Sequence, residues 1–161
     1  MSAAAETQAL AALEKLLHLA GLEAKVTARV EGDRILLEVE GPDSGLVIGK
    51  QGATLEALQF LVNKVVYRDA LGPAPILVDA EGYRGRRADS LRSLARRLAE
   101  DAKRSGRRIY MAPMSASDRR IVHMEIAEIP GVSTQSEGEG MQRRLVIIPD
   151  PAGELADDEA L

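Results

Sequence analysis

The spacing of apolar residues divides the first half of the chain into helices and strands. Apolar residues at helical spacing predict helices over 5–20 and 53–70, with a short helical turn over 43–48. Strands are predicted over 25–30 and 35–40, where apolar and polar residues alternate, and over 75–79. Gly32-Asp33 is suited to a tight turn between the first two strands, and Gly72-Pro73 is placed to end the long helix. The inner face of that helix is expected to carry Leu55, Leu58, Leu61, Val62, Val65 and Val66.

The second half of the chain predicts a long helix followed by a small unit of one helix and three strands. An apolar stripe with Gly106 after it indicates a helix over about 84–105. The following pattern predicts a strand over 107–111, a helix from Ser115 or Ser117 to about 128, and strands over 132–136 and 143–148. The first half has the order α-β-β-α-α-β, and the fold class expected for the whole chain is α+β.

Charge is distributed very unevenly along the chain. The formal net charge is −4, yet residues 83–108 hold ten basic and three acidic side chains, while residues 1–82 hold seven and twelve and residues 109–161 hold four and ten. A basic block of this kind is the usual mark of contact with a polyanion. The tail, 149–161, has five acids and no base, and we expect it to be disordered.

Composition excludes several classes of protein. The absence of cysteine excludes disulfides, thiolate metal sites and cysteine nucleophiles, and it fits a reducing cytoplasm. We expect no signal peptide and no membrane segment, because no basic start precedes an apolar run and no run reaches about 18 apolar residues. With only three tyrosines and one phenylalanine, a platform that stacks several bases on aromatic rings is not expected.

The loop Gly49-Lys50-Gln51-Gly52 is the strongest candidate for a binding site. Two glycines let a backbone approach a phosphodiester chain closely where the next helix presents its free N–H groups. Lys50 adds positive charge, and Leu46 and Ile48 are expected to line an apolar groove for bases. A Gly-x-x-Gly pattern alone usually marks a tight turn, but here it stands between two predicted helices. We expect Gly52→Asp to weaken nucleic-acid binding sharply without unfolding the protein.

A second candidate surface lies on the helix that begins near Ser115. Arg119 and His123, four positions apart, share one helical face from which both can donate to phosphate or a base edge. Arg120 and the later Arg143 add charge to this surface. The alternative is a capped surface helix with one partly buried histidine.

The basic helix has two interpretations. Its arginines, among them Arg84, Arg86, Arg87, Arg92, Arg96 and Arg97, are candidates for auxiliary RNA contacts. Alternatively, the helix is a spacer between two binding units, with Glu100 and Asp101 pairing locally with Lys103 and Arg104.

These motifs together resemble a known family. The α-β-β-α-α-β frame around Gly-x-x-Gly is similar to a KH domain of type II. The sequence from Gly45 to Gly52, followed by Thr54-Leu55 and Leu58-Gln59, resembles more specifically that of the Jag family (SpoIIIJ-associated proteins, also called KhpB). The resemblance to this family extends over about residues 20–148. Arg-x-x-x-His is the signature of the R-3-H domain that follows the KH domain there. The resemblance implies a KH domain over 5–82 and, over 83–148, a basic linking helix with a small α/β R-3-H domain.

The resemblance also implies a function and site residues. It implies a post-transcriptional regulator or RNA chaperone linked to cell envelope growth and division, which pairs with a small single-KH protein or with itself. The RNA-binding residues that it and the motifs indicate are Leu46, Ile48, Gly49, Lys50, Gln51, Gly52, Thr54, Arg119, Arg120, His123 and Arg143. Many Jag proteins have a further N-terminal domain; only the helix at 5–20 precedes the hairpin here, so the roles of that domain are not carried over.

The function predicted from the sequence is therefore a non-enzymatic, cytoplasmic protein that binds single-stranded RNA. Two alternatives remain: a single-stranded DNA binder, and a protein-interaction module on a ribosome or division assembly. Catalysis is not expected, because no nucleophile, base and orienting partner can be assembled and no Walker loop is present. We expect no cofactor and no metal, since His18 and His123 lack the ligand spacing of a metal site.

Overall fold

The computed structural model describes residues 3–68 and 75–151, which form two compact units, residues 1–86 and 87–161. Helices and antiparallel strands occur in both units, and the α+β fold class expected from the sequence is confirmed. The boundary between the units falls just after the first turn of a long helix, α4 (Tyr83–Ser105). The prediction that the tail 149–161 is disordered was wrong at its start: Pro149 is the last residue of a strand (Arg144–Pro149), and the Asp150 N–H donates to the Gly131 carbonyl at 3.0 Å. The rest of the tail, 152–161, lies outside the described residues.

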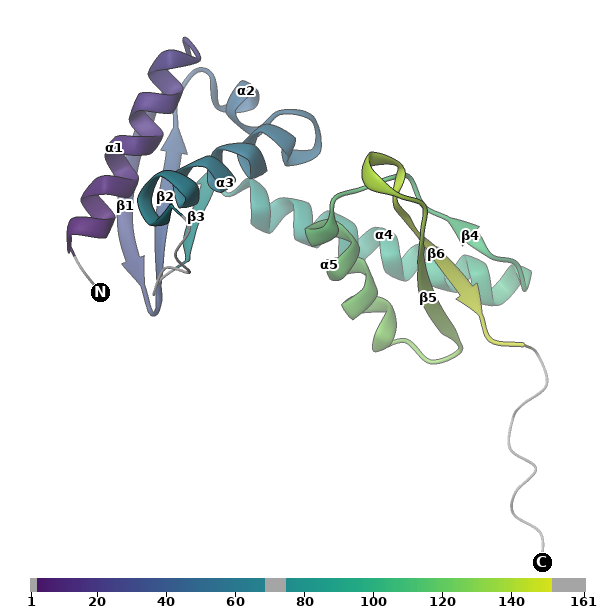
Figure 1. The fold of residues 1–161 in the computed structure, drawn as a ribbon. Helices are drawn as coiled ribbons and strands as arrows, with labels where there is room; N and C mark the ends of the chain where they lie inside the picture. The colour runs from purple at the N-terminus through teal and green to yellow at the C-terminus, as the bar shows by residue number, and fades with distance from the viewer. Residues whose placement is uncertain (1–2, 69–74, 152–161) are drawn as a thin grey trace, which may run out of the picture. The chain divides into compact units, whose positions relative to one another are not determined.

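The first unit has the predicted order of elements (Figure 1). These are α1 (Ala3–Leu19), β1 (Lys25–Glu31), β2 (Arg34–Glu40), α2 (Ser44–Ile48), the short 3-10 helix η1 (Lys50–Gly52), α3 (Ala53–Tyr67) and β3 (Ile76–Ala80). β1 and β2 form an antiparallel hairpin, and β3 lies parallel to β2, so the sheet order is β1-β2-β3. A parallel neighbour requires a crossover connection, and α2 and α3 provide it.

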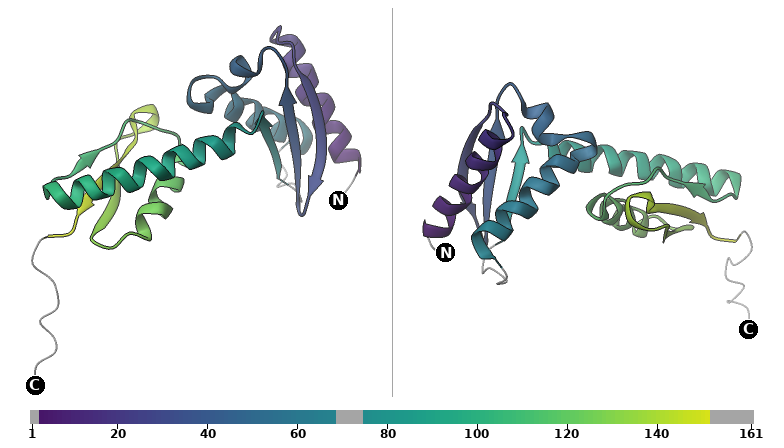
Figure 2. Two further views of the ribbon diagram at one scale, coloured as in Figure 1. Left: turned by 180° about the vertical axis from the view of Figure 1, so that it is seen from behind. Right: turned by 45° about the horizontal axis from the view of Figure 1, so that its top comes forward.

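Helices α1 and α3 cover one face of this sheet, as the opposite views in Figures 1 and 2 show. Leu13 from α1, Leu37 from β2 and Val62 from α3 are fully buried in the core between the layers. The prediction for α3 was wrong at Leu61 and Val65, which are exposed. At about 100° per residue, Val65 lies roughly 60° and Leu61 roughly 100° around the helix from Val62. Both are beyond Leu58, the edge of the buried stripe of α3, so they do not reach the core.

Helix α3 also occupies the free edge of β3. The side-chain amide of Asn63 donates to the Ile76 carbonyl at 2.8 Å and accepts from the Ile76 N–H at 3.3 Å. Gln59 Oε1 accepts from the Val78 N–H at 3.1 Å. Side chains thus satisfy backbone groups that would otherwise be unpaired. α3 ends at Tyr67 rather than at residue 70, and the Gly72-Pro73 stop lies outside the described residues.

The second unit packs two helices on one face of an antiparallel sheet. Its elements after α4 are β4 (Ile109–Tyr110), α5 (Ala116–Ala127), β5 (Val132–Glu137), η2 (Gly140–Gln142) and β6 (Arg144–Pro149). β6 is the central strand of the order β4-β6-β5. Leu91 and Ala95 of α4 share a core with Val122 and Ile126 of α5 and with Ile147 of β6. Two views from opposite sides agree that α4 lies on one face of this sheet (Figures 1 and 2). The strand expected over 107–111 has only two residues in β4.

Among the described residues, no helix combines the length and the apolar content that crossing a membrane would require.

Candidate nucleic-acid interface

The Gly49–Gly52 loop has a backbone that depends on both glycines. Gly49 has φ 70° and Gly52 has φ 81°, and both values lie in the region that side chains with a Cβ rarely adopt. A Cβ on Gly49 would overlap the Thr54 hydroxyl. Gln51 also adopts the left-handed conformation, with φ 53° and ψ 28°, at a cost of roughly 1 kcal/mol. Lys50 and Gln51 are exposed at the tip, whereas Gly52 is buried.

The turn between β3 and α4 supports this loop from below. A Cβ built on Gly52 would lie 2.8 Å from Cε1 of Tyr83, so that ring packs directly against the glycine. The Ser44 hydroxyl, at the start of α2, lies 2.7 Å from both Glu81 Oε1 and the Gly41 carbonyl. The Glu81 N–H donates to the Val39 carbonyl at 3.2 Å, which ties the turn to the sheet. These contacts fix the loop between α2 and α3 before any ligand binds.

The loop presents groups suited to phosphate. No side chain caps the start of α3, where the Gly52 N–H donates to the Gly49 carbonyl and the Ala53 N–H to the Lys50 carbonyl. A helix start without an acidic cap, next to an exposed ammonium group, favours an anion. Leu46 is 64% exposed, whereas Ile48 packs partly against the core, so Leu46 offers more apolar surface to a base.

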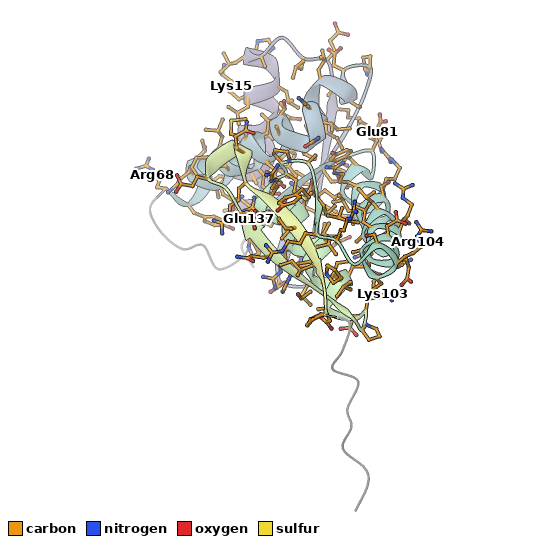
Figure 3. All side chains as sticks on the ribbon, turned by 90° about the vertical axis from the view of Figure 1, so that its right-hand side faces the viewer. Lys15, Arg68, Glu81, Lys103, Arg104 and Glu137 are labelled. Atoms are coloured by element: carbon orange, nitrogen blue, oxygen red, sulfur yellow. The ribbon has the colours of Figure 1, made fainter. Side chains whose placement is uncertain are left out.

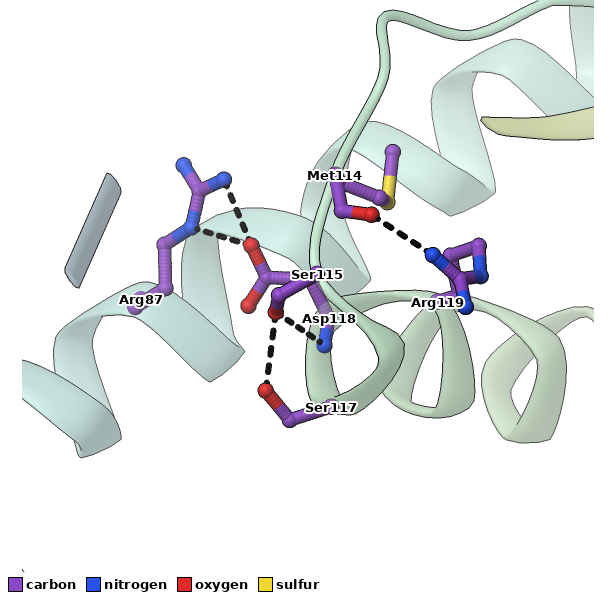
Figure 4. Close-up of polar contacts among 6 residues, drawn as sticks. All are labelled: Arg87, Met114, Ser115, Ser117, Asp118 and Arg119. Carbon is purple, nitrogen blue, oxygen red and sulfur yellow. Dashed lines mark hydrogen bonds and ion pairs between the residues drawn. The ribbon is translucent and has the colours of Figure 1, made fainter. Parts of the chain in front are cut away.

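In the second unit, hydrogen bonds link two predicted site residues, Arg119 and Arg143. Arg119 Nη1 donates to the Met114 carbonyl at 2.7 Å (Figure 4), and the Met114 N–H donates to the Arg143 carbonyl at 3.2 Å. Arg143 Nε in turn donates to Ser136 Oγ at 2.8 Å. The Arg119 guanidinium, which was expected to point outward, is half-buried and shapes the loop before α5.

His123 is placed next to this network by β5. Its Nδ1 lies 2.6 Å from Thr134 Oγ1, while the ring is exposed and Nε2 contacts no hydrogen-bonding partner in the described chain. Thr134 and Ser136 are two residues apart on one face of β5, about 7 Å along the strand. His123 and Arg143 therefore lie side by side along that strand. Arg120 is exposed on α5 and makes no ion pair within the described residues.

The arginines of α4 are largely committed to intramolecular contacts. Arg84 donates to the Val78 carbonyl and to Gln59 Oε1, and Arg86 donates to the Glu81 carbonyl. Arg87 donates from Nε and Nη2 to Oδ2 of Asp118, at 3.1 and 2.8 Å (Figure 4). Asp118 is buried, and its N–H is capped by Ser115 Oγ at 3.2 Å. Any RNA contact by Arg84 or Arg87 would have to compete with these bonds.

Four further cations of α4 form ion pairs nearer the surface, whereas the exposed Arg97 forms none with the described residues. Arg92 pairs with Asp89, and Arg96 Nε lies 2.5 Å from Glu125 Oε1. That hydrogen bond, together with the negative charge of Glu125, raises the pKa of Arg96. The local pairs predicted at the end of the helix are present: Lys103 pairs with Glu100 and Arg104 with Asp101 (Figure 3 labels the two cations). Direct RNA contact by Arg92 or Arg96 stays a prediction.

Sequence reasoning missed the residues that hold the two surfaces in place. Tyr83 and Glu81 lie some 30 residues from the Gly49–Gly52 loop, and Asp118 is 31 residues from Arg87. Long-range partners of this kind leave no local periodicity to detect. His18 is exposed, and the described part of the chain contains no group of three His, Cys, Asp or Glu side chains arranged to hold a metal.

Comparison with known protein families agrees with the division of the chain into two units. The sequence matches the family described as KhpA/KhpB, KH domain, over residues 7–72, and the R-3-H domain family over residues 89–149.

Similar full-length proteins point the same way. The RNA-binding protein KhpB of Clostridium symbiosum is 37% identical over 111 residues, which are 69% of this chain and 50% of that protein. KhpB of Bacillus subtilis (strain 168) is 34% identical over 124 residues, 76% of this chain and 60% of that protein. KhpB of Streptococcus pneumoniae serotype 2 is 28% identical over 141 residues, which are 88% of this chain and 43% of that protein. The chain spans about half the length of these relatives.

The Gly-x-x-Gly loop lies within an α-β-β-α-α-β unit, and the Arg-x-x-x-His helix packs on the small sheet that follows. Each feature falls in the segment matched by the corresponding domain family. The chain therefore belongs to the Jag/KhpB family, in which a KH domain is followed by an R-3-H domain.

Proposed function

We propose that this protein is a non-enzymatic, cytoplasmic binder of single-stranded RNA. The observation that carries the proposal is the Gly49–Gly52 loop, in which Gly52 packs against Tyr83 while Lys50 and Gln51 stay exposed. A loop of this form clamps about four nucleotides by their backbone in KH domains. Arg120, His123 and Arg143 supply a second contact on the second unit, called the R-3-H unit from here on. The relatives named as RNA-binding proteins support this proposal.

Family membership also supports a cellular role and a partner. We infer a role in post-transcriptional control or RNA remodelling linked to envelope growth and division, in company with a small single-KH protein or a second copy. Crosslinking of RNA to the protein in cells, followed by sequencing, tests the first part. Co-purification after nuclease treatment tests whether a protein partner remains bound without RNA.

The binding proposal is tested by reversing the charge at the tip of the loop. The double variant Lys50→Asp/Gln51→Asp leaves both glycines in place, and aspartate tolerates the left-handed conformation of residue 51. Fluorescence anisotropy with a labelled, unstructured RNA should show at least a tenfold loss of affinity.

A matched control makes the same charge change elsewhere in the first unit. Gln8→Asp/Lys15→Asp alters two exposed residues of α1 (Figure 3 labels Lys15). At near-physiological salt, exposed charges farther than about 8 Å from the RNA are largely screened, so this variant should bind like the wild type. Equal affinities for both double variants would overturn the assignment of the loop.

A further inference from the structure

The sheet of the R-3-H unit has one covered face and one open face. Ile109, Ile147 and Thr134 are neighbours in the strand register, and Ile109 and Ile147 contact the core formed with α4 and α5. Successive side chains alternate between the two faces of a strand. The next register row, Tyr110, Val146 and Gln135, therefore points away from both helices. No described helix or strand of this unit covers that face.

The open face carries an aromatic ring beside unpaired positive charge. Tyr110 is 52% exposed, and the Arg144 guanidinium carbon lies 5.0 Å from its ring centroid. Arg107 and Arg108, just before β4, are exposed and their side chains form no hydrogen bond or ion pair with the described residues. Glu137, the register partner of Arg144, brings one negative charge nearby. Several arginines of α4 have carboxylate partners within the chain, whereas Arg107, Arg108 and Arg144 bind no carboxylate of the described residues.

Single-stranded nucleic acid matches this chemistry. Every base has a π-face that stacks on an aromatic side chain, and guanidinium groups bind the phosphates on either side or stack themselves. A protein partner would be expected to meet a larger apolar area. Here Val146 contributes no exposed surface, Ile148 is only half-exposed, and the neighbours Ser133 and Gln135 are polar and exposed. The charge favours a polyanion, and the single exposed ring provides room for one base.

We propose that Tyr110 and Arg144 form a base-stacking site for single-stranded RNA on the open face of the R-3-H sheet, with Arg107 and Arg108 binding the adjoining phosphates. The site is separate from the Arg119–His123 surface, because His123 bonds to Thr134, which points to the opposite face of the sheet. The proposal rests on the RNA-binding function inferred above. The stacking site adds to the proposed function a contact with an RNA base, in addition to contacts with the RNA backbone.

The test compares two RNA probes and two substitutions of one residue. The probes are a fluorescein-labelled adenine-rich RNA and the same chain with abasic sites in place of the bases. Tyr110→Val removes the ring but suits an exposed edge strand, and Tyr110→Phe keeps the ring. Tyr110→Val should bind the adenine-rich RNA about 5- to 150-fold more weakly, and the abasic chain as the wild type does. Tyr110→Phe should match the wild type on both probes.

Arg144→Gln separates charge from stacking. It should weaken binding to both probes, because the substitution removes a positive charge that attracts the phosphates of either probe as well as a stacking group. The DNA version of the adenine-rich probe should show the same ratio between wild type and Tyr110→Val, since stacking does not involve the 2′-hydroxyl.

Three results would overturn the proposal. The first is wild-type affinity of Tyr110→Val for the adenine-rich RNA while Lys50→Asp/Gln51→Asp is impaired; this leaves the proposed function intact. The second is an equal loss on both probes, which removes stacking as the cause. The third is a change in oligomeric state of Tyr110→Val by sedimentation without a change in RNA affinity, which assigns the face to a protein contact. Absence of RNA binding by the wild type would reject the proposed function itself.

Discussion

Tyr83 packs against Gly52 so closely that a Cβ on the glycine would lie 2.8 Å from the tyrosine Cε1. This contact changes the expectation for Gly52→Asp. From the sequence, the substitution was expected to place a carboxylate against phosphate without unfolding the protein. In the structure, the new side chain meets the ring below the loop and residue 52 keeps φ 81° only under strain.

We therefore expect Gly52→Asp to lower the free energy of unfolding by roughly 1–3 kcal/mol, in addition to weakening RNA binding. Urea denaturation followed by circular dichroism measures the first effect. Gly45→Asp is the matched control, because a Cβ at Gly45 meets nothing within 4 Å and its φ is not positive. Equal stability of the two variants would show that the loop can rearrange around Tyr83.

Arg119 offers a test of positioning against charge. Its guanidinium donates to the Met114 carbonyl from a half-buried position, and lysine would keep the charge but lose the planar donor. Arg119→Lys should weaken RNA binding nearly as much as Arg119→Ala, and amide exchange around Met114 should become faster. Arg104→Lys, at an exposed residue near the end of α4, should change neither. Full affinity of Arg119→Lys would mean that Arg119 acts only as a charge.

The ion pair between Arg87 and Asp118 should contribute to the stability of the R-3-H unit. Asp118 is 5% exposed, so Arg87→Met leaves a buried carboxylate without its partner and should cost about 2–4 kcal/mol in urea unfolding. Replacing both residues, as Arg87→Met/Asp118→Leu, should restore part of this loss. The double-mutant cycle measures the coupling, and additive effects of the two single changes would contradict it.

Salt dependence reports how many phosphates are bound. If the Gly49–Gly52 loop alone neutralises about four phosphates, log K should fall with log salt at a slope near −3 (roughly −0.7 per phosphate). Contacts by the R-3-H unit should make the slope steeper. Arg108→Gln should then reduce its magnitude by about 0.7, which anisotropy titrations over a range of salt concentrations can resolve. An unchanged slope would show that Arg108 contacts no phosphate.

The elements of the fold could be predicted because local spacing determines them. The strands around Gly32 and the stripe of α4 were predicted from periodicity alone. Residue type left Ser115 and Ser117 as the two candidate caps of α5, and the structure has Ser115. Burial was predicted less well, since Leu61 and Val65 are as apolar as Val62 but lie beyond the edge of the buried stripe and are exposed. Spacing in the sequence shows which side chains share a face of a helix, but whether that face is buried depends on where the opposing layer lies.

The candidate site divides in the same way. Gly49, Gly52 and the pair Arg119–His123 are recognisable because a local backbone or helical spacing requires them. The supporting contacts of Tyr83 and Asp118, and the pairing of Arg144 with Tyr110, arise from tertiary structure. A count of basic residues also pointed to α4, whereas several of its arginines bind carboxylates or carbonyls. Charge along a sequence does not show which charges remain available to a ligand.

The amides of Asn63 and Gln59 have a consequence for assembly. They occupy the outer N–H and carbonyl of Ile76 and the outer N–H of Val78, and Arg84 occupies the Val78 carbonyl. These backbone groups are then no template for a strand from another chain, whether from a partner's peptide or from a misfolded neighbour. The β3 edge of the sheet in the first unit therefore cannot pair with an added strand, either in β-augmentation or in fibril-like stacking.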